Sequence, residues 1–137
     1  MTVGHAEPSQ RVVLQRIHNR ILEYLECASS FEAQREYQRN PRIDVPSEMI
    51  AEWWDWYDDE RAPAYVAPAF SDSERDAMTM FHRVWKDVAD ATPKPLPDLE
   101  TTIRLPEWTR LRAAAELALA VFRVRGLLPE DVEIESA

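Results

Sequence analysis

The stretch Asp44–Glu60, DVPSEMIAEWWDWYDDE, sets the fold class and carries the most unusual composition in the chain. It has three Trp and one Tyr within five positions, and seven acidic residues with no Lys or Arg. Pro46 has no N–H and a fixed φ, so it suits the first turn of a helix. Pro63 disfavours helical geometry in the residue before it. We therefore predict a helix from about Pro46 to Arg61.

As a helix, this segment has one apolar side and one acidic side at about 100° per residue. The apolar arc contains Met49, Ile50, Trp53, Trp54, Trp56 and Tyr57, and the opposite arc contains Glu48, Glu52, Asp55, Asp58 and Asp59. The apolar arc spans about 160°, wider than the roughly 100° that seats a helix on a core. Trp54 and Trp56 lie at its edges. Either a connector such as 62–69 covers these indoles, or one of them is an exposed binding anchor.

Three further segments have the hydrophobic periodicity of helices. Apolar residues recur at three- and four-residue steps within about 9–28, 72–90 and 106–125. Ser71 with Glu74 matches a capping box before the second segment, and Gly126 suits a helix stop after the third. Ser29 with Glu32 matches another capping box. The first helix therefore either stops just before Ser29 or bends and continues.

The connections also favour helices over strands. Segment 92–97, TPKPLP, contains three Pro and predicts an extended link. The chain has only two Gly, whereas a β-rich chain with many tight turns usually needs more. We therefore predict an all-α fold, a single-domain antiparallel bundle of four to five helices.

Size and composition indicate one globular domain. The chain has 137 residues, of which 45% are hydrophobic and 30% charged, and a chain of this length buries about two-thirds of its extended surface. We assign 1–137 to a single helical domain, with a loose N-terminal arm at 1–8 and an acidic C-terminal tail at 127–137. Val132 and Ile134 alternate with polar residues, so the tail has an apolar side that could lie on the domain.

The charge predicts the kind of partner. The net charge is −9, and contacts with phosphate need Lys and Arg, so nucleic acid and anionic membranes are unsuitable partners. A basic protein would be attracted by the same field. Cys27 has no second cysteine to pair with, and residues 1–10 lack the pattern of a secretory signal, so we expect a cytoplasmic protein.

The sequence contains no motif for catalysis, a cofactor or a metal. Two Gly in total exclude the Gly-rich loops that bind phosphate. Cys27 lies beside an acidic residue, the opposite of the environment that a nucleophilic thiol needs. His5, His18 and His82 lack the spacing of metal-ligating pairs. We expect no catalytic residue, no metal site and no cofactor.

One arrangement of acids has an enzymatic counterpart. Glu23-x-x-Glu26 and Glu52-x-x-Asp55 lie on two predicted helices. This pattern resembles the E-x-x-E…E-x-x-D motif of the MazG-like, all-α nucleotide pyrophosphohydrolases. The resemblance implies that the four acids hold Mg²⁺ on a nucleoside triphosphate. All four point away from the apolar faces of their own helices, which favours a solvated acidic surface instead.

As a whole, the chain resembles the small, acidic, cytoplasmic immunity proteins that are paired with bacterial toxins. The resemblance rests on length, acidity, helical architecture and the missing catalytic motif. It implies a protein-binding inhibitor that covers a basic toxin or nuclease. The partner-binding residues would be Glu48, Glu52, Asp55, Asp58 and Asp59 for charge, with Trp54 and Trp56 as anchors. A phage-type inhibitor, a MazG-like hydrolase and a structural or homo-oligomerising helical module remain alternatives.

Overall fold

The computed structural model describes residues 7–135. Its helices are α1 (Gln10–Ala28), α2 (Phe31–Gln38), α3 (Val45–Trp56), the 3₁₀ turn η1 (Ala62–Ala64), α4 (Asp72–Ala91), α5 (Leu99–Ile103) and α6 (Pro106–Arg123). Within 7–135 there is no strand, which confirms the all-α prediction for these residues. Residues 1–6 of the predicted arm and 136–137 of the predicted tail lie outside the described part.

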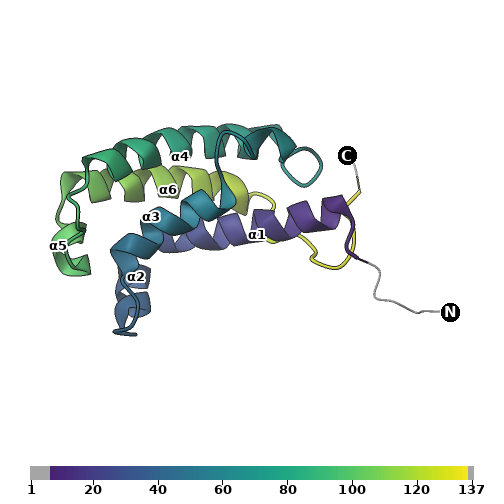
Figure 1. Ribbon diagram of the computed structural model, residues 1–137. Helices are drawn as coiled ribbons and strands as arrows, with labels where there is room; N and C mark the ends of the chain where they lie inside the picture. Colours follow the sequence, from purple (N-terminus) through teal and green to yellow (C-terminus); the bar gives the residue numbers. More distant parts are fainter. Residues whose placement is uncertain (1–6, 136–137) are drawn as a thin grey trace.

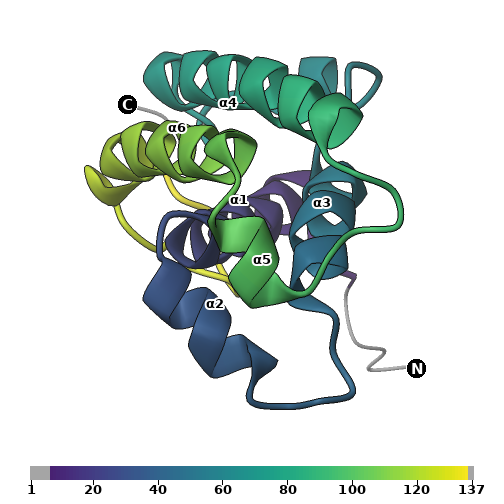
Figure 2. The same ribbon diagram turned by 90° about the vertical axis from the view of Figure 1, so that its left-hand side faces the viewer.

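The number of helices differs from the predicted four to five, since residues 7–135 form six α-helices. Figure 1 shows α4 and α6 side by side and antiparallel, and α6 also runs antiparallel to α1, with which it is in contact. The shorter α3 crosses α1 obliquely, and Figure 2 shows α2 and α5 grouped at one end of the four longer helices. Of the predicted antiparallel bundle, the structure therefore contains only the arrangement of α1, α4 and α6.

Serine side chains define the starts of three helices. Ser9 Oγ accepts from the Val12 N–H at α1, and Ser30 Oγ accepts from the Ala33 N–H at α2. At α4 the capping box is complete, because Ser71 and Glu74 each bind the other's backbone N–H. The predicted box at Ser29 is wrong by one residue, since Ser29 ends α1 and its neighbour begins α2.

Helix α3 ends at Trp56, well before the predicted end at Arg61. Tyr57 has extended geometry (φ −144°, ψ 132°), and its ring turns back into the core to stack on Trp53 at 5.1 Å. Arg61 then folds back and donates to the carbonyls of Trp54 and Asp55, which are left open at the helix end. The acids after Tyr57 therefore do not continue the helical face.

A buried ionic network joins three distant segments. Glu74 is almost completely buried, and its carboxylate accepts from His18 Nε2 at 3.0 Å and from Arg125 Nε at 3.1 Å. Arg125 also donates to the carbonyls of Pro68 and Ala69. The network fastens α1 to the start of α4 and to the end of α6. Burial alone raises the pKa of Glu74, but the hydrogen bonds from His18, Arg125 and the Ser71 N–H together lower it to about 2.

The acidic tail lies along α1. Asn19 is buried and binds both backbone groups of Leu128: its amide donates to the Leu128 carbonyl, and its carbonyl accepts the Leu128 N–H. Gln15 binds the tail in the same way, by donating to the carbonyls of Pro129 and Val132 and accepting the Ile134 N–H. These two amides hold the tail on α1 up to Ile134. They act together with three arginines of α1, because Arg11 donates to the Ile134 carbonyl, Arg16 to the Glu130 carbonyl and Arg20 to the Glu130 carboxylate.

We expect Asn19→Ala to detach the start of the tail, because it leaves both backbone groups of Leu128 buried without a partner. Such a loss costs about 2 kcal/mol of unfolding free energy. Amide exchange of Leu128 should accelerate in the variant, whereas Ile134, which Gln15 and Arg11 still hold, should exchange at the wild-type rate. The exposed Asn40→Ala is the control, and a Leu128 amide that exchanges equally slowly in both variants would contradict this account.

Candidate functional site

The three tryptophans of α3 have three different environments. Trp53 is completely buried, and its indole N–H donates to His82 Nδ1 at 3.0 Å. Trp54 is 52% exposed and stacks on Trp85 of α4, with ring centroids 5.8 Å apart and an interplanar angle of 15°. Trp56 is half-buried against the core. Of the two predicted anchors, Trp54 therefore offers far more surface than Trp56.

The acids of α3 face a groove between α1, α2 and α3. The groove has a volume of about 450 Å³ and is lined by the carboxylates of Glu23, Glu48, Glu52 and Asp55. Its remaining walls come from aromatic and other side chains, namely Arg20, Tyr24, Cys27, Tyr37, Met49 and Trp56. On the outer surface of α3, helical geometry places the acids on an arc bounded by Trp54 on one side and Trp56 on the other.

Most of these carboxylates have no cation of this chain beside them. Glu23 pairs with Arg20 at 2.9 Å. Between residues 7 and 135, no Lys, Arg or His nitrogen lies within 4 Å of a carboxylate oxygen of Glu48, Glu52 or Asp55. These three α3 acids therefore repel one another without internal compensation.

The repulsion is visible at Glu52. Burial raises the pKa of the Glu52 carboxyl, and the charges of Glu48 and Asp55 raise it further, while a hydrogen bond from Tyr37 acts in the opposite direction. Ionisation of Glu52 is therefore less favourable in the folded chain than in the unfolded chain. A cation entering the groove would relieve this penalty.

Cys27 forms part of the same wall. Its thiol is half-buried, and burial together with the Glu52 charge raises its pKa to about 11. The thiol therefore stays protonated at neutral pH, and the acid that raises its pKa is Glu52 of α3 and not the neighbouring acid Glu26.

Asp58 and Asp59 are not part of this acidic face. Both follow the end of α3, in the turn that leads to η1. Asp58 is tied to Arg61, with its carboxylate 3.4 Å from the Arg61 Nε and accepting the Arg61 N–H. Asp59 is exposed and lies 3.8 Å from His82 Nε2. The helical wheel placed them with Glu48 and Glu52 only because it extended the helix past Tyr57.

His18 and His82 each have a buried polar partner that the sequence did not indicate. His82 lies between the rings of Tyr57 and Trp85, at 5.0 and 5.4 Å. Burial lowers its pKa, although the nearby Asp59 acts in the opposite direction. The neutral ring accepts the Trp53 N–H, so His82 orients the buried tryptophan. Trp53 lies in another helix 29 residues away, so no local pattern could have revealed this pair.

Three of the four acids in the MazG-like pattern line the groove. Glu23, Glu52 and Asp55 face it, whereas Glu26 is drawn to the other side of α1 by Arg123 of α6 at 3.6 Å. Within the described part of the chain, no three His, Cys, Asp or Glu side chains are grouped closely enough to hold a metal ion. The four-acid arrangement that the resemblance implied is therefore not assembled.

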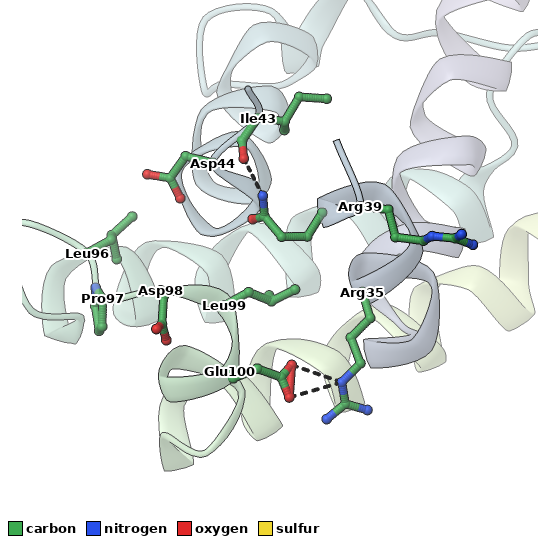
Figure 3. A pocket seen from close by; sticks show the side chains of 10 residues that line it. Arg35, Arg39, Ile43, Asp44, Leu96, Pro97, Asp98, Leu99 and Glu100 are labelled. Carbon is green, nitrogen blue, oxygen red and sulfur yellow. Dashed lines mark hydrogen bonds and ion pairs between the residues drawn. The ribbon is translucent and has the colours of Figure 1, made fainter. Parts of the chain in front are cut away.

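A second hollow lies between α2, α5 and the Pro-rich link, with a volume of about 710 Å³ (Figure 3). Figure 3 shows Arg35 directed at Glu100, and the Arg35 Nε lies 3.0 Å from the carboxylate. Arg39 at the rim pairs with Glu36. Both arginines are thus compensated within the chain, unlike the acids of the α1–α3 groove.

No known protein family matches this chain, and no curated protein or solved structure is significantly similar to it. Among residues 7–135, every helix is too short or too polar to cross a membrane.

Proposed function

We propose that this chain is a protein-binding inhibitor of the immunity type, which neutralises a basic toxin or nuclease by receiving its cationic side chains in the α1–α3 groove. The observation that supports the proposal most directly is the uncompensated acid trio of Glu48, Glu52 and Asp55. A protein that only needed to fold would gain stability by pairing or removing these charges.

The aromatic surroundings suit the same role. Lys and Arg side chains bind to aromatic rings as well as to carboxylates, and Arg binds carboxylates through two parallel hydrogen bonds. Tyr37 and Trp56 in the groove, with Trp54 exposed beyond the acids, give both kinds of contact. The net charge of −9 would steer a basic partner towards the protein over distances of about one Debye length.

One substitution with two measurements tests the proposal. Glu52→Gln removes the repulsion with Glu48 and should raise the free energy of unfolding at pH 7 by about 0.5 kcal/mol. The sign follows from the raised pKa: ionised Glu52 costs stability above its folded pKa, and the cost fades as pH falls through it. The same substitution should weaken binding to a basic protein partner.

The binding measurement should use a panel of cationic toxins and nucleases with the full chain, at two salt concentrations. Affinity should fall as salt rises, and Asp55→Lys should reduce it at least tenfold. Asp72→Lys, an exposed acid at the start of α4, is the charge-matched control. If no cationic protein binds, or if both Lys variants weaken binding equally, the groove is not the binding site.

A further inference from the structure

The outer face of α4 and α6 has exposed apolar side chains at its centre, with charged residues towards both ends. Met80 is 64% exposed and Leu117 is 71% exposed. Between them runs a groove of about 470 Å³, whose walls include Val84 and Val121. Contiguous exposed apolar surface often marks a contact with another protein, and this groove is the clearest such surface among the described residues.

The α6 side of this face has the spacing of a helix–helix seam. Arg110, Ala113, Leu117, Ala120 and Val124 follow one another along α6 at alternating steps of three and four residues, and all five are exposed. This is the heptad spacing by which helices pack along a common line. The small Ala side chains permit close approach of a second helix, and the only charge in the series is at its start.

The position of Arg110 shows the register between α4 and α6. The Arg110 Nη2 lies 3.8 Å from the Asp87 carboxylate. Because the two helices are antiparallel, a step of seven residues back along α4 and seven forward along α6 brings Met80 level with Leu117. The face therefore has an ion pair at one end, an apolar pair in its centre and Asp76 towards the other end.

We propose that this face binds a second copy of the chain, with the two-fold axis parallel to the helices. That symmetry places α4 of each copy on α6 of the other at the same level. Met80 then meets Leu117 of the second copy, and the two Asp87–Arg110 pairs form a ring of four alternating charges. The product is a four-helix bundle in which every neighbour is antiparallel.

The charges on α4 disfavour the other two-fold axis by which this face could bind a second copy. A two-fold axis that runs across the helices would place α4 of one copy on α4 of the other. It would bring Asp87 towards Asp76 of the second copy, a like-charge contact in a partly desolvated site.

Two adjacent helices of 18 and 20 residues present a face about 30 Å long and 20 Å wide, so the dimer would bury about 1,200 Å² in total. This is the lower end of specific interfaces, so the dissociation constant should be micromolar.

Sedimentation equilibrium of the full chain tests for the dimer. Protein concentrations from about 1 µM to about 1 mM cover the expected dissociation constant. The dimer should strengthen as salt rises, because salt screens repulsion between two copies of charge −9. Binding to a basic partner should weaken under the same change. The two proposals therefore respond to salt with opposite signs and fail separately.

Leu117→Glu should abolish the dimer and leave the helical content unchanged, because the side chain is already exposed. Val132→Glu, an exposed apolar position on the tail, adds the same charge away from the seam and should leave the dimer intact. Two results would overturn the proposal: a wild-type chain that is still monomeric at the highest concentration, about 1 mM, or a dimer that persists in Leu117→Glu.

The direction of the two-fold axis can be tested separately from the existence of the dimer. Asp87→Arg alone and Arg110→Asp alone each produce a ring of four like charges, so each variant should be monomeric. Mixed together, the two variants bring the two Arg of one copy against the two Asp of the other, so each contact across the interface again joins opposite charges and a heterodimer should form. If the wild-type chain dimerises but the mixture does not, the assigned symmetry is wrong.

Discussion

Replacing Glu74 with Gln is expected to lower the free energy of unfolding at pH 7 by about 3 kcal/mol, because it leaves the partly buried Arg125 without its counter-charge. The two carbonyls that also bind Arg125 remain, but they supply no charge. A loss of this size is a large part of the 5–15 kcal/mol that typically stabilises a domain. Chemical denaturation followed by circular dichroism measures it.

The pH dependence separates a loss of charge from a loss of packing. The pKa of Glu74 falls from 4.5 to about 2 on folding. A lowered carboxyl pKa contributes stability that is complete above the unfolded value and is lost as pH falls through the folded value. The wild-type chain should therefore lose about 3 kcal/mol between about pH 5 and pH 2, and Glu74→Gln should lack this component. Asp72→Asn, an exposed acid on the same helix, should retain it.

Replacing Trp53 with Ala is expected to cost about 3–5 kcal/mol, the usual range for removing a large buried aromatic side chain. Trp53 packs against Phe81 at 4.6 Å and Tyr24 at 5.6 Å. The substitution also leaves His82 Nδ1 buried without its donor. Urea denaturation should show the loss as a lower midpoint, with the slope unchanged.

The adjacent residue supplies the matched control. Trp54→Ala removes an indole of the same size, but one that is half-exposed and stacked only on Trp85. We expect a cost below about 1 kcal/mol in stability and a loss of at least tenfold in affinity for the proposed basic partner. Equal destabilisation by the two substitutions would contradict the assignment of Trp53 to folding and Trp54 to binding.

Local signals in the sequence predicted the helices well where periodicity and caps coincide. The capping box of Ser71 and Glu74 gave the start of α4 at the correct residue, and Gly126 adopts the positive φ of 70° expected after α6. The prediction was wrong at the end of α3, because nothing local to Tyr57 requires it to leave the helix. Its stacking on Trp53 and its contact with Tyr65 decide the boundary.

The candidate site was also predictable only in part, because some of its residues are brought together by contacts between distant segments. Glu48, Glu52 and Asp55 share a face because helical geometry is local. That Glu23 and Tyr37 join them depends on how α1 and α2 pack, which periodicity does not specify. Gln15 and Asn19 are amides four residues apart at the edge of the apolar stripe of α1, and both are buried, so they need partners. The tail supplies those partners.

The position of Cys27 gives the protein a built-in reporter. A thiol-specific reagent can react with only one side chain in this chain, and that side chain lines the groove proposed to receive a partner. Because its pKa is about 11, labelling should be slow at neutral pH and accelerate as the solution becomes alkaline. A bound partner should shield the sulfur, so the rate of modification would measure occupancy directly, without a tag or an engineered label.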